Sequence, residues 1–407
     1  MTDMTTTLKC KMNNLEEKIR RKRQNIIMIL PSLVWLPVAM LWFVFRKLAS
    51  RGKIPTDVKI VRIFRSAALG DVVLTTSAIE AVKRSYPEAC LEFIVGGQYA
   101  SILEHNGQIT KLWAIETGGL WKIVWKNKNI IRHLVKDRSD ILLGLETSLS
   151  AAVFGWATMP RSHVGDKWGL QRYFYDKTAS CKAGQSHLIN MSLICREAGI
   201  DYPIEKWKTK ICLDSGEKEQ AELMLGRAGY NGGIILAIHP GGGNIHSPEV
   251  KKNWPAIRYA RVLSLLNQKF KFTTLLLSGP GEEDLARTIK AEYKGKLIDL
   301  SGQTTIRQLA ALIACSDLFL GNDSAPGHMA VALNVPSVTI WGSSDPNEYG
   351  IGSPSLHHRV YAQGLGCRPC RRPNCIKLQS HKWKCLSDIT EKTVVDSLIS
   401  LINEMGL

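Results

Sequence analysis

Acidic residues are scarce in this 407-residue sequence: 36 aspartates and glutamates stand against 53 lysines and arginines, for a formal net charge of +17. Also missing is the interleaving of basic and aromatic residues that marks nucleic-acid-binding modules. Of the remaining partners for such a charge, we expect an anionic membrane surface ahead of a phosphorylated substrate, and no nucleic acid. A G-x-G-x-x-G turn is absent after the first expected strand, and Gly96-Gly97 ends the second where an acidic residue would be needed. These two absences disfavour a dinucleotide-dependent oxidoreductase.

Residues 26–45 contain no charged residue over about the length of a bilayer-spanning helix. They follow a basic polar N-terminus, residues 1–25, and precede Arg46 and Lys47. No small-residue cleavage site comes cleanly after the run, which disfavours a cleaved signal peptide. We therefore predict a membrane anchor. Because both flanks are positive and two prolines interrupt the helix pattern, a full span and a re-entrant anchor are both open, and a buried soluble helix is a third alternative.

The remaining pattern predicts two Rossmann-like doubly wound α/β domains that face a central cleft. The first domain is expected at residues 57–215, and the second at residues 233–387. Each opens with an apolar strand, a turn of small residues and a helix. Residues 216–232 are expected to connect the domains, and residues 388–407 to form a closing helix. Within the first domain, residues 120–135 are expected to form one basic amphipathic helix.

Asp71 lies at the carboxyl end of the first expected strand, at the start of a helix. Ligands of open parallel sheets bind at such positions. The helix dipole stabilises a carboxylate there, and that carboxylate is well placed to accept a proton from a substrate hydroxyl. The alternative is a helix-start aspartate that takes no part in chemistry.

A second strand-to-helix turn, Gly321-Asn322-Asp323-Ser324, follows an apolar run. Pro326 comes in the first turn of the next helix, where proline is tolerated. The free N–H groups at the start of that helix suit an anion such as phosphate. Because asparagine, aspartate and serine also lead among helix-capping residues, a plain cap is the alternative.

Two further segments are candidates for contact with a phosphate group. Gly241-Gly242-Gly243 follows a buried strand, and consecutive glycines let the backbone come close to a ligand. Lys252 would supply a counter-charge for the phosphate. A plain loop and an exposed surface lysine are the alternatives.

Together these motifs resemble glycosyltransferase family nine, the ADP-heptose lipopolysaccharide heptosyltransferases, which have the two-domain GT-B fold. The resemblance covers roughly residues 58–400 and is carried by SAALGDVVL at 66–74, HPGG at 239–242, KNWP at 252–255 and NDSAPGH at 322–328. The family commonly has glycine where this chain has Ala325, and the apolar N-terminal segment is not part of the usual pattern.

The resemblance implies an inverting glycosyltransferase of lipopolysaccharide core or related envelope glycan synthesis. It would move a sugar, with heptose the first candidate, from a nucleotide-sugar donor such as ADP-heptose to a hydroxyl of a lipid-linked saccharide. Asp71 would be the general base, and Lys252 would stabilise the departing diphosphate without any cofactor. The acceptor would contact Arg65 and Ser66. The implied donor-binding residues are Gly241, Gly242, Gly243, Asn322, Asp323, Ser324, Ala325 and His328.

The same resemblance, combined with the predicted anchor, implies a location at the cytoplasmic face of the bacterial inner membrane. In GT-B enzymes the closing helix often packs back onto the first domain, and we expect this of residues 388–407. The alternative function is a non-catalytic nucleotide-binding membrane protein that assists envelope glycan assembly.

Four of the ten cysteines cluster near the end of the chain as Cys367-x2-Cys370-x4-Cys375-x9-Cys385. Four thiols at such a spacing suit a structural zinc ion in a closed tetrahedral site. Reduced free thiols and disulfides are the alternatives. The other six cysteines are scattered, mostly in apolar or helical contexts, as expected for buried thiols of a reduced, intracellular protein.

Overall fold

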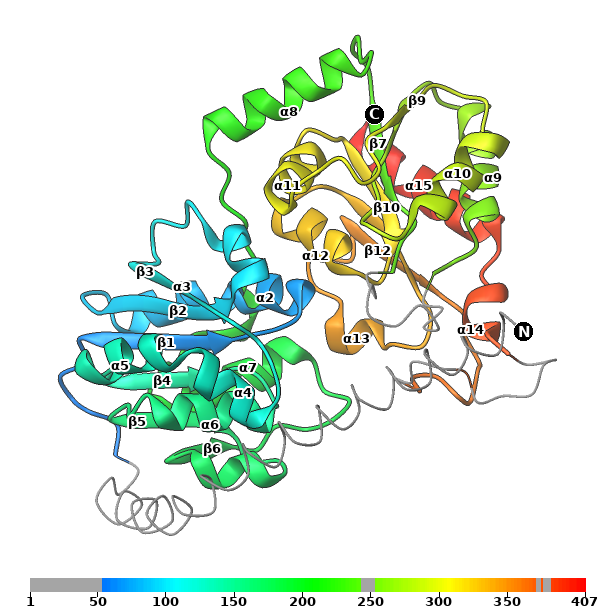
Figure 1. Ribbon diagram of the computed structural model, residues 1–407. Helices are drawn as coiled ribbons and strands as arrows, with labels where there is room; N and C mark the ends of the chain where they lie inside the picture. Colours follow the sequence, from blue (N-terminus) through cyan, green and yellow to red (C-terminus); the bar gives the residue numbers. More distant parts are fainter. Residues whose placement is uncertain (1–52, 243–252, 371–374, 376–381) are drawn as a thin grey trace, which may run out of the picture. The chain divides into compact units, whose positions relative to one another are not determined.

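The strands of the first half form one parallel sheet in the order β3-β2-β1-β4-β5-β6 (Figure 1). The computed structural model describes residues 53–242, 253–370, 375 and 382–407, and residues 54–407 make up one compact unit. This strand order, with its reversal between β1 and β4, is that of a doubly wound fold. The strands are β1 (Ile60–Arg65), β2 (Cys90–Gly96), β3 (Lys111–Ile115), β4 (Ile141–Gly144), β5 (Ser162–Asp166) and β6 (Lys177–Ala179).

Helices cover both faces of this sheet, because successive strand residues point to opposite sides. Ile63 joins the larger apolar core under α2, α3 and α7, whereas Phe64 joins a second core under α4, α5 and α6. The helical segments are α2 (Leu69–Thr75), α3 (Ser77–Ser85), η1 (Gly97–Leu103), α4 (Leu120–Lys126), α5 (Lys128–Lys136), α6 (Leu149–Ala157), η2 (Leu170–Phe174), α7 (His187–Glu197) and η3 (Ile204–Lys206).

The expected single helix over residues 120–135 is two helices, α4 and α5, which meet at Asn127. The Asn127 side chain is buried and donates to the carbonyl oxygens of Glu116 and Ile123, at 2.8 and 2.7 Å. Its Oδ1 accepts the N–H of Glu116 at 2.9 Å. These bonds tie the helix break to the segment that follows β3, so a side-chain contact made outside the helix interrupts an otherwise continuous amphipathic pattern.

The second half repeats the topology of the first, with the parallel order β12-β11-β10-β7-β8-β9. The predicted pair of Rossmann-like doubly wound domains is thereby confirmed, with six strands in each sheet. The strands are β7 (Ile235–His239), β8 (Thr273–Leu276), β9 (Leu297–Asp299), β10 (Leu318–Asn322), β11 (Ser337–Trp341) and β12 (His357–Tyr361). The helices are α8 (Ser215–Arg227), α9 (Ala256–Asn267), α10 (Glu283–Glu292), α11 (Ile306–Ala314), α12 (Ala325–Ala332), α13 (Pro346–Tyr349), α14 (Lys384–Ser387) and α15 (Glu391–Met405).

The closing helix α15 packs on the second half, against α9, β11 and β12, which differs from the expected packing on the first domain. Its apolar face, which includes Val394 and Leu398, is buried in the core of the second sheet. Polar contacts support the same position, since Glu391 pairs with Arg261 at 3.2 Å and the Ser397 hydroxyl lies 3.0 Å from Nδ1 of His358. The C-terminal helix therefore packs within the half of the protein that contains the second sheet.

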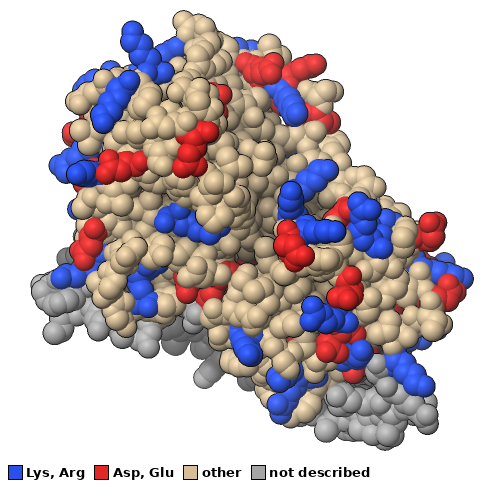
Figure 2. All heavy atoms as spheres, turned by 180° about the vertical axis from the view of Figure 1, so that it is seen from behind, with Lys and Arg blue, Asp and Glu red and all other residues tan. Residues whose placement is uncertain are grey.

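The predicted anchor at residues 26–45 lies outside the described residues. Within the residues that are described, no helix combines the length and the apolar character that a bilayer crossing requires. On the face of the molecule seen in Figure 2, lysine and arginine are mixed with aspartate and glutamate. The excess positive charge of the chain therefore forms no single basic surface on that face.

Candidate active site

Asp71 lies in the first turn of α2, beside the end of β1, and forms an ion pair with the last residue of that strand. The Arg65 guanidinium is 2.8 Å from the Asp71 carboxylate and also donates to the carbonyl of Leu145. Burial by itself would raise the pKa of Asp71. The charges of Arg65 and His187, with hydrogen bonds from Arg65 and from the N–H of Ala68, outweigh that effect and lower the pKa below its ordinary value. Asp71 is therefore a carboxylate at neutral pH, as a base must be before it accepts a proton.

Ser66, an expected acceptor contact, is instead bound within the protein. Its N–H and its hydroxyl both donate to Oε2 of Glu146, at 2.6 and 2.8 Å, and the residue is 6% exposed. Glu146 follows β4 and accepts a further bond of 2.5 Å from the hydroxyl of Ser148. The Ser66 side chain thus holds the turn after β1 against the end of β4. Of the two residues expected to contact the acceptor, Arg65 lines the cavity beside Asp71 and Ser66 does not.

A cavity of about 560 Å³ opens beside Asp71. Its walls come from the ends of β1 and β4, the segment after β5, the start of α7, and α13 of the second half. Two of its residues, His187 and Tyr349, were not expected from the sequence. Their rings stack at a centroid distance of 4.3 Å, so α7 and α13 meet directly at the cavity. Nothing in their sequence neighbourhoods signals this contact, which only the tertiary fold creates.

Asp71 and His187 influence each other across this cavity. Burial lowers the pKa of the His187 imidazole, the Asp71 charge raises it, and the Arg65 charge lowers it; the net shift is downward. His187 is therefore mainly neutral at neutral pH. A neutral imidazole both donates and accepts a hydrogen bond, which suits contact with a hydroxylated ligand.

Asn322, an expected donor contact, also has a structural role. It is fully buried at the end of β10. Its Oδ1 accepts from the N–H of Trp254 at 3.2 Å and from the hydroxyl of Tyr259 at 2.9 Å. Its Nδ2 donates to the carbonyls of Pro240 and Gly241, at 2.6 and 3.3 Å. An amide side chain has two donor and two acceptor positions, so Asn322 has none left for a ligand and instead holds together two loops of the expected donor site.

The turn after Asn322 leads directly into α12. Ser324 is the N-cap residue but makes no side-chain cap bond; its hydroxyl donates to the Asn322 carbonyl at 3.2 Å. The carboxylate of Asp323 accepts from the Ser344 hydroxyl. Ala325 is the first helical residue, and it is not among the described residues with positive φ, so this turn does not require the family's glycine. Pro326 has no N–H, and the N–H of Gly327 donates to the Ser324 carbonyl at 3.0 Å, so the N–H of Ala325 is the first-turn donor that an anion could use.

His328 links the two candidate sites, because α2 and α12 pack against each other. A Cβ atom added to Gly70 would lie 2.9 Å from Cδ2 of His328, which shows how closely the helices approach. Burial lowers the pKa of His328, whereas the charges of Asp323 and Asp71 raise it, and the net shift is downward. The His328 imidazole therefore interacts electrostatically with both the candidate base on α2 and the aspartate in the turn before α12.

The glycine loop after β7 is described only as far as Gly242, so Gly243 and Lys252 lie outside the described residues. Gly241 is packed so tightly against the Glu282 carboxylate that a Cβ atom there would overlap it, at 2.0 Å from both oxygens. Because Gly241 has no side chain, the Glu282 carboxylate, in the turn before α10, can approach the glycine loop closely.

None of the four clustered cysteines, all of which are among the described residues, forms a disulfide bond. Burial raises the pKa of Cys385 to about 11, and its neighbours Cys370, Cys375 and Cys367 also raise it. The thiols thus lie close enough to interact, and four thiolates are a donor set that zinc accepts. Among the described residues, however, the group whose ligand atoms all lie within 4.8 Å of one another is His105, Asp214 and Glu217, which does not include these cysteines. The predicted zinc site therefore stays a prediction.

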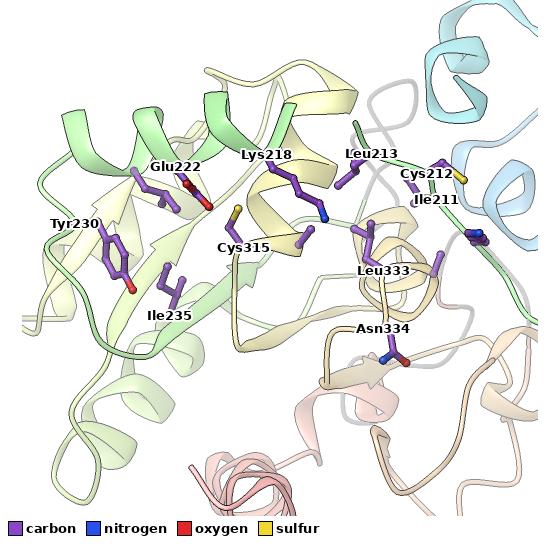
Figure 3. Close-up of a pocket in the computed structure, with 14 residues that line it drawn as sticks. Ile211, Cys212, Leu213, Lys218, Glu222, Tyr230, Ile235, Cys315, Leu333 and Asn334 are labelled. Atoms are coloured by element: carbon purple, nitrogen blue, oxygen red, sulfur yellow. The ribbon is translucent and has the colours of Figure 1, made fainter. Parts of the chain in front are cut away.

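A larger cavity, of about 1040 Å³, lies away from these residues (Figure 3). It is lined by Lys218 and Glu222 of α8, by Ile235 at the start of β7, and by Asn334 in the loop before β11. These positions belong to the amino ends of the second sheet. Because ligands of such sheets bind at the carboxyl ends of the strands, this cavity is not the donor site.

Comparison with known proteins agrees with this geometry. The sequence model of glycosyltransferase family 9 (heptosyltransferase) matches residues 128–381, which is more than half of the chain and begins after Asp71. Lipopolysaccharide heptosyltransferase 3 of Escherichia coli is 26% identical over 293 residues, covering 68% of this chain and 81% of the relative. Lipooligosaccharide heptosyltransferase 2 of Campylobacter jejuni subsp. jejuni is 27% identical over 350 residues, covering 83% and 97%.

Two solved structures share the fold. The glycosyl transferase family 9 protein of Veillonella parvula superposes with a TM-score of 0.73 at 22% identity, covering 87% of this chain and 99% of that one. The ADP-heptose lps heptosyltransferase II of E. coli gives a TM-score of 0.67 at 18% identity, covering 86% and 100%. With two parallel Rossmann-like sheets and a match to the family model over most of its length, the chain belongs to glycosyltransferase family 9, the heptosyltransferase family, and is a glycosyltransferase.

Proposed function

We propose that this enzyme transfers a heptose from ADP-heptose to a hydroxyl of a lipid-linked saccharide, with inversion at the anomeric carbon, in lipopolysaccharide or lipooligosaccharide core synthesis. The relatives named lipopolysaccharide heptosyltransferase 3 and lipooligosaccharide heptosyltransferase 2 support the sugar and the class of acceptor. A fold neighbour, the E. coli heptosyltransferase WaaC, was solved with ADP-2-deoxy-2-fluoro heptose, which supports the nucleotide. We place the reaction at the cytoplasmic face of the membrane.

The observation that carries the mechanism is the ion pair between Asp71 and Arg65 at the wall of the cavity. The pair keeps Asp71 ionised, and an ionised carboxylate accepts the proton of the acceptor hydroxyl as that oxygen attacks the anomeric carbon. The bond between the anomeric carbon and the diphosphate oxygen breaks on the opposite face of the sugar, so a single displacement inverts the configuration. The proton ends on Asp71, and the electron pair of the broken bond leaves with ADP.

The diphosphate gains negative charge in this step and requires stabilisation. We assign that role to the N–H groups of Ser324 and Ala325 at the start of α12 and to Lys252, because the N–H of Asp323 already donates to the Ile340 carbonyl at 2.9 Å. Neutral His328, between Asp71 and Asp323, would contact the donor where the sugar meets the diphosphate. Donor and acceptor are then held by different halves of the protein, and the reaction requires both at once.

The proposal is tested by comparing ADP-heptose with UDP- and GDP-sugars on the purified full chain. Thermal unfolding shows which donor binds, because a ligand that binds only the folded state raises the melting temperature. Mass spectrometry then follows transfer to a heptose-terminated core saccharide, and NMR of the product gives its anomeric configuration. Transfer from ADP-heptose with inversion is expected. Transfer only from another nucleotide sugar would overturn the donor assignment, and retention of configuration would overturn the single displacement.

A further inference from the structure

An exposed apolar patch lies between β5 and β6. Residues 167–173, hereafter the 167–173 patch, expose three large side chains: Trp168 is 70% exposed, Leu170 66% and Tyr173 44%. Together these leave roughly 400 Å² of mainly apolar surface, which is the size at which an exposed patch on a monomer often has a binding role. Gln171, between them, is buried, so one polar residue faces inward while its apolar neighbours face outward.

Two cations accompany these side chains. The Arg172 guanidinium lies 4.7 Å from the centre of the Tyr173 ring and donates to its hydroxyl at 2.6 Å. The Lys167 ammonium donates to the hydroxyl of Ser180 at 2.7 Å. Over the described residues, none of the ion pairs between side chains involves Lys167 or Arg172. Their positive charges are therefore available to an external anion.

The patch borders the cavity beside Asp71. Trp168 lines that cavity together with Lys182, whose side chain is exposed. Whatever the patch contacts will therefore lie beside the cavity that Asp71 lines. This proximity distinguishes the patch from other exposed apolar side chains, such as Leu223 on α8.

The same side of the first sheet carries a second exposed tryptophan. The segment η2 packs on α6, and α6 packs on α4, so the three follow one another along the first sheet. Figure 1 shows α6 and α4 beside each other. Trp125 of α4 is 65% exposed, and the Lys128 ammonium lies 5.1 Å from the centre of its ring. The pairing of an exposed aromatic ring with a cation thus occurs twice on this side, in η2 and at α4.

We propose that the 167–173 patch docks on the headgroup region of an anionic bilayer and holds the acceptor cavity against the membrane surface. Tryptophan and tyrosine favour the membrane–water interface, leucine enters the acyl boundary, and lysine and arginine attract anionic headgroups. This inference rests on the proposed lipid-linked acceptor: with its lipid in the bilayer, the acceptor saccharide would enter the cavity from the side where Trp168 lies. The apolar run at 26–45 belongs to the same chain and ends shortly before β1.

A second copy of the chain fits the patch less well than a bilayer. A stable protein–protein interface buries about 800 Å² on each partner, roughly twice the area exposed here. Clustered cations also oppose the approach of an identical patch, whereas they attract anionic lipid.

Hydrogen exchange of the unmodified full chain tests the docking surface directly. Phosphatidylcholine vesicles with phosphatidylglycerol are compared with vesicles without it. We expect exchange in peptides covering 167–175 to slow by about tenfold on the anionic vesicles, with no change in peptides from α8. Equal exchange of 167–175 in bound and free protein would overturn the proposal. So would protection that needs no vesicles and grows with protein concentration, because that would identify an interface between copies.

A double variant, Leu170→Ser with Tyr173→Ser, tests the consequence for catalysis and leaves the cavity residue Trp168 in place. Its matched control is Leu223→Ser, at a leucine that is 58% exposed on α8. We expect KM for an acceptor embedded in anionic vesicles to rise about tenfold, with transfer to a deacylated, water-soluble acceptor unchanged. Equal loss on both acceptors, or loss on neither, would refute the docking role. Failure of the unmodified enzyme on every acceptor would instead refute the proposed function.

Discussion

Replacing Asp71 with asparagine removes the proposed base while keeping the shape of its side chain. The amide can still meet Arg65 but is far too weak a base to take the hydroxyl proton. A positioned general base contributes about 10²- to 10⁴-fold to a rate, which corresponds to about 3 to 5 kcal/mol of activation free energy. We therefore expect kcat to fall by about 10²- to 10⁴-fold, while donor affinity, which depends on the second half of the protein, stays within about twofold.

The same substitution has a cost in stability that can be worked from the ion pair. The two charged groups are 2.8 Å apart, and their side chains are 10% and 28% exposed, so the pair is neither buried nor fully solvated. Loss of such a pair should cost about 1 to 2 kcal/mol, between the values for exposed and buried pairs. The folded pKa of Asp71 lies below its unfolded value, so this stabilisation is present above the unfolded pKa and is lost as pH falls through the folded pKa. The difference between wild type and variant should therefore be constant at neutral pH and vanish only below about pH 4.

Both quantities are measurable on one pair of proteins. Steady-state transfer assays give kcat, and urea unfolding at neutral and acid pH gives the free energy of unfolding. Asp57→Asn is the matched control, because that carboxylate is 75% exposed and its ion-pair partner among the described residues is Lys59, at 3.2 Å. A variant Asp71→Asn that retains more than about a tenth of the wild-type kcat would refute the assignment of Asp71 as the base.

Three further outcomes are expected. Asn322→Ala leaves four buried polar partners without their hydrogen bonds and should lower the free energy of unfolding by about 3 kcal/mol or more, measured by urea unfolding; a loss below about 1 kcal/mol would contradict the saturated network. Tyr349→Ala removes the ring stacked on His187 and should raise KM for the acceptor about five- to tenfold with KM for the donor unchanged; the reverse pattern would move this stack to the donor site. If the cysteine cluster holds zinc, metal analysis of the full chain should find about one ion per chain, and Cys385→Ser should lose it. A metal-free chain in which the four cluster thiols react with a thiol reagent would instead assign reduced cysteines.

The sequence predicted the strands that bear the site because they are short, apolar and followed by turns. The run at 318–320 and the strand at Ser337–Trp341 are β10 and β11, and Pro326 lies in the first turn of α12 as expected. The repeated order of strand, turn and helix was enough to predict two doubly wound sheets. Periodicity alone did not reveal the interruption at Asn127, because that break depends on a side-chain contact with a segment eleven residues earlier.

Residue type predicted the location of the site better than the role of each residue. Asn322 and Ser66 were expected to contact ligands, yet their side chains bond to residues 63 to 82 positions away in the sequence. Conversely, His187 and Tyr349 stack beside Asp71 although both are far from it in sequence. Whether a polar atom remains available depends on long-range packing, which a single sequence does not display.

The position of α15 has a consequence for how the enzyme could be divided. Because this helix packs on the second sheet, the described chain passes from one six-stranded sheet to the other by way of the segment that leads into α8. A single protease cut in that passage would leave two polypeptides, each with a complete sheet. Catalysis would then become a bimolecular property of two fragments, and its dependence on fragment concentration would measure how strongly α2 and α12 hold together without a covalent link.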